Sequence, residues 1–184
     1  MSAALRRSFV WTSIAALFLD QLTKTIVYGM FNKPGASNSV PLIGSILKIS
    51  FTTNPHGVFG IGFGSPVAHL ILQCVGIILV LFFGLRTKST FLGCAYGIIL
   101  GGALGNLIDR FRLGYVIDFL DFEIRPLRFR WFTFNLADAF IVVGVILIFI
   151  YEIISGAREK KEKIEKEKKN EDACLSGQQL HNPD

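Results

Sequence analysis

The residue types that build metal centres and disulfide frameworks are scarce in this sequence. Only three cysteines and three histidines occur among its 184 residues. Two of the cysteines lie inside apolar runs and the third lies near the C-terminus, and an odd count placed in this way argues against a disulfide framework. The histidines are far apart, and none belongs to an HExxH motif or has a Cys pair beside it. We therefore expect neither a metal ion nor another cofactor.

Basic charge is present, with a formal net charge of +5, but it does not form a surface suited to nucleic acid. Lysine and glutamate fill residues 157–171, a run typical of a solvated tail. Elsewhere no large surface outside the apolar segments combines basic and aromatic side chains, which argues against a nucleic-acid partner. The sequence predicts a single domain over residues 1–156, followed by a charged and partly disordered tail over residues 157–184.

Long apolar runs dominate the chain. Hydrophobic residues make up 51% of it, and the mean hydropathy is +0.49. Four segments are long and apolar enough to span a bilayer, at about residues 9–30, 66–85, 91–108 and 134–154. Four spans place both termini on one side of the membrane. That side carries eleven of the 19 Lys and Arg residues, so the positive-inside rule favours cytoplasmic termini.

Two connections between the spans carry strand-like or interfacial patterns. Residues 46–53, ILKISFTT, alternate apolar and polar side chains as a half-buried strand does, and VFGIGFG, residues 58–64, can return beside it. Residues 127–132, LRFRWF, alternate arginine with aromatic side chains, which suits the membrane interface. We therefore predict an all-α membrane protein, with four transmembrane helices and a small β element.

Apart from Glu152 at the cytoplasmic end of the last span, the few acidic residues that precede the tail gather at one membrane boundary. Asp109 ends the third span, Asp138 begins the fourth, and Asp118 lies in the connection between them. Asp20 lies about 16 Å along the first helix, towards the same boundary. Because ionisable residues in a membrane are costly, they commonly mark a functional site.

Neighbours in the sequence divide these carboxylates into two groups. Asp20 can pair with Lys24 one helical turn later, and Asp109 is followed directly by Arg110, so structural ion pairs suit both. Asp118 and Asp138 have no neighbouring cation. Two such carboxylates at one apolar boundary can hold different pKa values, so that one activates water and the other protonates a leaving amine.

Asparagine stands three residues before aspartate in two places, at Asn106/Asp109 and Asn135/Asp138. Residues three apart share a helix face, so each amide can orient its carboxylate or a bound carbonyl group. Asn135 can also be the N-cap of the fourth helix, and both roles remain open. Asn106 lies too late in its helix to cap the start, which favours a functional role. The segment GGALG, residues 101–105, predicts close helix packing.

Four blocks of the sequence carry a family pattern: LDQLTK at 19–24, GGALGNLIDR at 101–110, VIDF at 116–119 and FNLAD at 134–138. Together they resemble the blocks of the lipoprotein signal peptidases (signal peptidase II), a family of bacterial membrane aspartyl proteases. The resemblance extends in order to about Ile154. It implies an endopeptidase of the inner membrane that cleaves prolipoproteins just before their lipid-modified cysteine, with Asp118 and Asp138 as the catalytic dyad.

The resemblance also implies a substrate-binding or supporting role for seven more residues: Asp20, Lys24, Asn54, Asn106, Asp109, Arg110 and Asn135. It implies that the outer strands form a β-cradle, and that the connection between the third and fourth helices forms a flap-like loop over the substrate near the periplasmic face. Lipid-modified prolipoproteins and membrane phospholipids are the expected partners, and a monomer is the expected state.

One block departs from the family pattern. The family usually reads Asn-x-Gly-Ala-Ala-Phe, whereas residues 54–59 are NPHGVF. Pro55 restricts Asn54 to extended geometry. This departure bears on how substrates or inhibitors fit and leaves the two aspartates unaffected.

Two other functions fit parts of the sequence less well. Ser65 and His69 are one helical turn apart, the spacing of a nucleophile and its base in a serine protease. However, no acid is near to orient the histidine, and a serine before a proline is typical of an N-cap. A small membrane transporter or ion-binding protein would hold its acids at the bilayer midplane on interrupted helices. Here the acids lie at the boundary.

Overall fold

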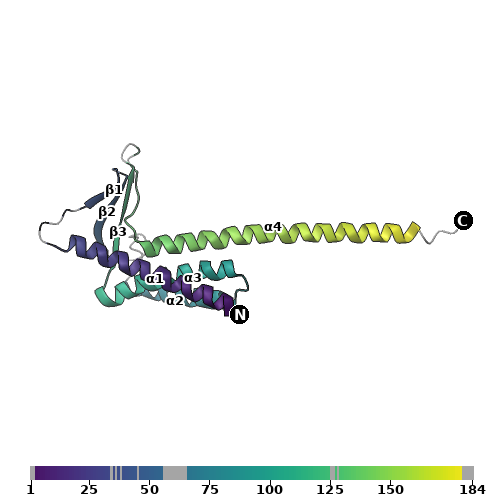
Figure 1. Ribbon diagram of the computed structural model, residues 1–184, viewed down its shortest axis with the longest axis horizontal. Helices are drawn as coiled ribbons and strands as arrows, with labels where there is room; N and C mark the ends of the chain where they lie inside the picture. The colour runs from purple at the N-terminus through teal and green to yellow at the C-terminus, as the bar shows by residue number, and fades with distance from the viewer. Residues whose placement is uncertain are drawn as a thin grey trace. The chain divides into compact units, whose positions relative to one another are not determined.

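The computed structural model describes residues 3–33, 35, 37, 39–44, 46–55, 66–124, 127 and 129–179. The helices are α1 (Ala3–Phe31), α2 (Pro66–Arg86), α3 (Thr90–Leu113) and α4 (Leu136–Gln179), labelled in Figure 1. The chain divides into two compact units, Met1–Leu147 and Ile148–Asp184. The first unit contains α1, α2, α3, all the described strands and the beginning of α4.

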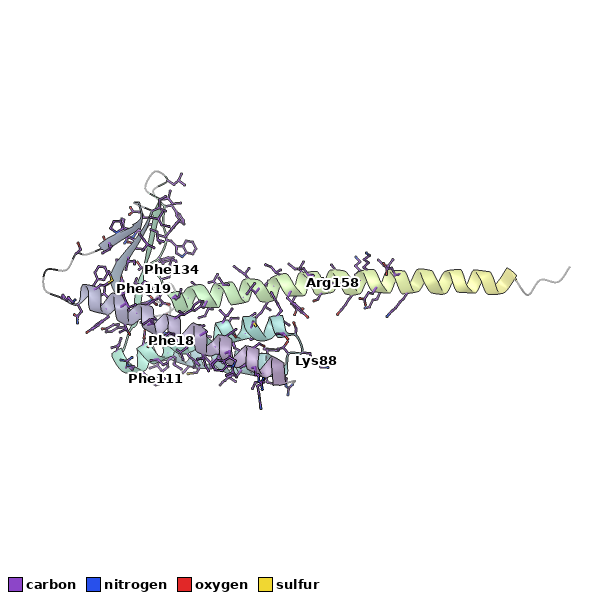
Figure 2. All side chains as sticks on the ribbon, viewed as in Figure 1. Phe18, Lys88, Phe111, Phe119, Phe134 and Arg158 are labelled. Atoms are coloured by element: carbon purple, nitrogen blue, oxygen red, sulfur yellow. The ribbon has the colours of Figure 1, made fainter. Side chains whose placement is uncertain are left out.

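All four helices contain a segment long and apolar enough to cross a membrane: Arg6–Phe31, Val67–Arg86, Thr90–Leu113 and Leu136–Lys166. Large apolar side chains lie on their outer surfaces. Phe18 and Phe111, labelled in Figure 2, are 62% and 72% exposed. Such exposure suits lipid as the surrounding solvent, where helices satisfy their own backbone hydrogen bonds. The predicted set of four transmembrane helices is confirmed.

The second unit consists of the later part of α4. The sequence places the end of the fourth span near residue 154, whereas the helix continues to Gln179. Lysine and glutamate are good helix formers, and Lys161 lies 4.0 Å from Glu165 one turn later. Residues 157–179 of the charged tail are therefore helical.

A four-stranded antiparallel sheet has the order β1 (Ser39–Ile43), β2 (Leu47–Asn54), β3 (Val116–Ile124) and β4 (Phe129–Arg130). β2 confirms the strand predicted at 46–53. The connection between α3 and α4, where a flap-like loop is expected, supplies β3 and β4. β3 pairs with β2 between Val116 and Phe122, with one shift in register. The glycine-rich segment 58–64 lies outside the described residues.

α3 packs against α1 through its glycines, as the GGALG segment predicts. A Cβ atom placed on Gly101 would collide with the backbone carbonyl oxygen of Ser13, and one placed on Gly105 would collide with the Asp20 carboxylate. On another face of α3, a Cβ atom on Gly102 would meet the backbone of Ala137. These close approaches bring α1 and the start of α4 against one end of α3, where the polar residues lie.

Candidate active site

Asp118 and Asp138 come together because Phe134, which lies just before α4, hydrogen-bonds to β3. The backbone N–H groups of Phe119 and Leu120 donate to the carbonyl oxygen of Phe134, at 3.0 and 2.7 Å. Phe119 and Phe134 are labelled where the sheet meets the start of α4 in Figure 2. Asp118 in β3 is 2% exposed and Asp138 in the first turn of α4 is 7% exposed. Two residues 20 positions apart in sequence thereby enter one buried cluster.

Asn135 links the two carboxylates and also begins α4. Its side-chain Nδ2 donates to Asp118 Oδ1 at 2.6 Å, and its backbone N–H is directed at Asp138 Oδ2 at 3.4 Å. Its Oδ1 accepts from the backbone N–H of Asp138 at 2.9 Å, which is an N-cap hydrogen bond. The structure therefore confirms the N-cap role of Asn135, while its amide nitrogen contacts Asp118 and not Asp138, the carboxylate three residues later.

Two further amides each hold one carboxylate. Asn54 Nδ2 donates to Asp118 Oδ2 at 2.9 Å, and Asn106 Nδ2 donates to Asp138 Oδ1 at 2.8 Å. Asn106 Oδ1 accepts from Lys24 Nζ at 2.8 Å and from Asn135 Nδ2 at 3.1 Å. Since the oxygen of Asn106 faces two donors and its nitrogen faces a carboxylate, the hydrogen-bond network fixes the orientation of this amide.

The surroundings of Asp118 change its proton affinity. Burial, and after it the nearby Asp138 carboxylate, raise the pKa of Asp118 from its ordinary value of 3.8 to about 6. The hydrogen bonds from Asn54 and Asn135 oppose this rise, because they favour the ionised form. The Asp138 carboxylate therefore helps to hold a proton on Asp118, which suits a site that needs one proton held and one carboxylate free.

Lys24 is buried at the centre of a second cluster beside the carboxylate pair. Its ammonium group lies 2.8 Å from Asp20 Oδ2, 2.9 Å from Asp109 Oδ2 and 2.8 Å from Asn106 Oδ1. An ammonium group has three N–H donors, and these contacts use all three. Asp109 pairs with Lys24 and not with Arg110, contrary to the sequence expectation, because neighbouring residues on a helix point about 100° apart.

The Lys24 cluster also binds the two backbone segments that carry Asp118 and Asp138. Asp20 Oδ1 accepts from the backbone N–H of Ala137 at 3.0 Å, one residue before Asp138. Asp109 Oδ2 accepts from the backbone N–H of Ile117 at 3.3 Å, one residue before Asp118. One buried cation thus positions both backbones through two carboxylates.

Gln21 completes this cluster and was missed by the sequence reasoning. Its Nε2 donates to Asp109 Oδ1 at 3.0 Å and to the carbonyl oxygen of Gly105 at 3.2 Å. The available signal was its place in the LDQLTK block, as an amide within an apolar helix between Asp20 and Lys24.

A groove of about 250 Å³ opens beside Asp138, between α2, α3 and α4. Its apolar wall includes Leu72, Ile77 and Ile141. Arg110, half-buried, also lines it, and its NH1 donates to Gln73 Oε1 at 2.7 Å. An apolar groove with a few convergent polar groups is the usual form of a binding site.

The serine-protease alternative finds no support in the described residues. His69 lines the groove in α2, and Ser65 lies outside the part of the chain that the structure describes. Of the nine residues singled out from the sequence, all lie in the two clusters or in the groove. The residues are Asp20, Lys24, Asn54, Asn106, Asp109, Arg110, Asp118, Asn135 and Asp138.

Comparison with protein families finds a match to the model for "Signal peptidase (SPase) II" over residues 12–154. The chain is similar to the lipoprotein signal peptidase of Halothermothrix orenii, with 37% identity over 139 residues, which are 75% of this chain and 90% of the relative. It is also similar to that of Desulfitobacterium hafniense, with 35% identity over 156 residues, 83% of this chain and 97% of the relative.

Two solved structures of a bacterial membrane enzyme, determined by the in meso method, have the same fold. The structure at 2.3 Å resolution aligns with a TM-score of 0.69 and 27% identity, over 82% of this chain and 90% of that one. The structure at 1.9 Å resolution aligns with a TM-score of 0.63 and 28% identity, over 78% of this chain and 90% of that one.

Proposed function

The chain belongs to the signal peptidase II family, and on this premise we propose that Asp118 and Asp138 are the catalytic dyad with which it cleaves prolipoproteins. Its activity is that of a lipoprotein signal peptidase, an aspartic endopeptidase of a bacterial membrane. We infer that it removes the signal peptide just before the lipidated cysteine. The observation that carries the proposal is the bridge that Asn135 makes between two buried carboxylates, at the polar end of an apolar groove.

Hydrolysis at this pair needs one ionised and one protonated carboxyl group. The ionised member takes a proton from water, whose oxygen attacks the scissile carbonyl carbon. The protonated member gives its proton to the leaving amine as the C–N bond breaks. After the reaction the pair still holds one proton, but on the member that was ionised at the start. Transfer of this proton to the other member, directly or through water, restores the starting state.

The groove supplies the binding surface for the substrate. Its apolar wall suits the hydrophobic signal peptide and the acyl chains, and Arg110 at its edge can donate charge-assisted hydrogen bonds to substrate carbonyl oxygens. Asn54, Asn106 and Asn135 orient the carboxylates. The Lys24 cluster keeps the backbones of both aspartates in place, because Asp20 and Asp109 accept hydrogen bonds from the residues just before them, Ala137 and Ile117.

We place the site at the periplasmic boundary of the inner membrane, with both termini in the cytoplasm. The distribution of Lys and Arg supports this orientation. In this arrangement residues 1–156 form the peptidase, which acts as a monomer among phospholipids, and residues 157–184 form a cytoplasmic tail. The carboxylates then lie where the hydrocarbon ends and water for hydrolysis begins.

Reconstitution of the full chain in bilayers with a purified prolipoprotein tests this function. The wild-type protein is expected to cleave the precursor that carries a diacylglyceryl group on its cysteine, and to leave the unmodified precursor intact. Ser65→Ala is the control and should cleave at the wild-type rate. Absence of cleavage by the wild type, or loss of cleavage in Ser65→Ala, would contradict the proposal in favour of ion binding or serine catalysis, respectively.

A further inference from the structure

Gln73 is the only amide side chain in α2, a helix that is otherwise almost entirely apolar. Polar side chains in membrane-spanning helices commonly hydrogen-bond across to a neighbouring helix. Gln73 does so twice. Its Nε2 donates to the backbone carbonyl oxygen of Ala103 at 2.8 Å, and its Oε1 accepts from Arg110 NH1 at 2.7 Å. Both ends of the amide are therefore used by α3.

Arg110 lies near several carboxylates, any of which would be an expected ion-pair partner for an arginine. The carboxylates of Asp138, Asp118 and Asp109 all act electrostatically on its guanidinium group. Even so, none of the ion pairs among the described residues involves Arg110. Its NH1 is held by Gln73 and, more loosely, by the carbonyl oxygen of Asn106 at 3.4 Å.

We propose that Gln73 is a positioning residue that holds the Arg110 guanidinium facing the groove and away from the catalytic carboxylates. The guanidinium group of arginine is planar and has five N–H donors. Because the group is rigid, a hydrogen bond that fixes NH1 also restricts the directions of the other donors. The held guanidinium can then bind a carbonyl oxygen of the lipid-modified peptide. This inference rests on the proposed function, because it requires the groove beside Asp138 to be the substrate site.

Steady-state kinetics of purified Gln73→Met with lipidated prolipoprotein tests this role. Methionine has a similar length and suits an apolar helix, but it cannot accept the Arg110 hydrogen bond in the same way. Arg110 is proposed to bind the substrate equally in the ground state and in the transition state. For Gln73→Met we therefore expect KM to rise about tenfold, with kcat changed less than threefold. Leu79→Met, a matched substitution at a half-exposed position of α2, should leave both constants unchanged.

A double-mutant cycle with Arg110→Gln separates positioning from a merely structural bond between α2 and α3. In the Arg110→Gln background, adding Gln73→Met should change KM less than twofold, because the group that it positions is absent. An undiminished tenfold effect in that background, or an unchanged KM in Gln73→Met alone, would overturn the inference. Thermal unfolding of each variant verifies that the proteins compared are folded.

Asp138→Asn, measured beside these variants, tests the proposed function separately. If it is inactive and the cycle shows no coupling, then the dyad stands and the role of Gln73 falls. If Asp138→Asn cleaves like the wild type, then the proposed function itself falls, and the inference with it.

Discussion

At the scale of single residues, asparagines hold both carboxylates. Asn54 and Asn135 donate to the two oxygens of Asp118, and Asn106 donates to Asp138. An amide can orient a carboxylate without neutralising it, whereas a lysine or arginine in the same place would favour ionisation of both groups. Lys24 contacts Asn106, the amide that holds Asp138, and its other two contacts are with Asp20 and Asp109.

The raised pKa of Asp118 predicts how stability depends on pH. Because the folded protein binds this proton more tightly than the unfolded chain, the contribution of Asp118 to stability is greatest below pH 3.8, decreases as pH rises to about 6, and is constant above. The total change corresponds to about 3 kcal/mol. As pH rises through this window, the thermal unfolding midpoint of the wild type should therefore fall relative to that of Asp118→Asn. A difference that does not vary with pH would show that the site leaves this carboxyl group unperturbed.

Lys24 predicts a large loss of stability when its charge is removed. Lys24→Met leaves Asp20 and Asp109 buried without their cation, and breaking a buried pair in this way costs about 3–5 kcal/mol. Lys48→Met is the control, because its pair with Glu123 is partly exposed and contributes about 1 kcal/mol or less. Equal unfolding midpoints for the two variants would contradict the central place given to Lys24.

Residues with a local signal were predictable from the sequence, and residues with only distant partners were not. Asp118 and Asp138 stood out because no cation lies near them in the chain. Gln21 and Gln73 contact residues that are 88 and 37 positions away, Asp109 and Arg110. Nothing near Gln73 in the chain distinguishes it from an amide with a purely structural role, and Gln21 is marked only by its place between Asp20 and Lys24.

At the scale of elements, the close approach of α1 and α3 is set by glycines. Gly101→Ala would drive a methyl group into the backbone of Ser13 and Leu17, so we expect a loss of about 1–3 kcal/mol, together with reduced cleavage as the Lys24 cluster separates. Gly29→Ala in α1 is the matched control, since a Cβ there has nothing within 4 Å. It should be neutral or stabilising by up to about 1 kcal/mol. Equal stability for both alanine variants would contradict this account of the packing.

The helices were predictable as elements, and β2 was too, because each carries a regular pattern of apolar residues. β3 was not recognised as a strand. Its first four residues, 116–119, are all buried, so the alternation that marks a half-buried strand is missing where the catalytic candidate lies. The continuation of α4 beyond residue 154 was also missed, because a charged run without an apolar face resembles a disordered tail as much as a helix.

At the scale of the whole molecule, the proposed orientation predicts which cysteines a membrane-impermeant maleimide can reach. In intact spheroplasts a cysteine introduced by Lys33→Cys, in the connection after α1, should be labelled, whereas Cys174 in the tail should not. Permeabilising the membrane should expose Cys174. Cys74 and Cys94, which lie in α2 and α3, are replaced by serine to remove background. Labelling of Cys174 in intact spheroplasts would indicate the opposite orientation and contradict the proposed one.

The central claim is that Asp118 and Asp138 together perform the hydrolysis. The most direct test is the rate at which purified Asp118→Asn and Asp138→Asn cleave a lipidated prolipoprotein, compared with wild type under the same conditions and with folding verified by thermal unfolding. Since each substitution removes a group that must donate or accept a proton, both rates should fall at least about a thousand-fold. Cleavage at the wild-type rate by either folded variant would contradict the account.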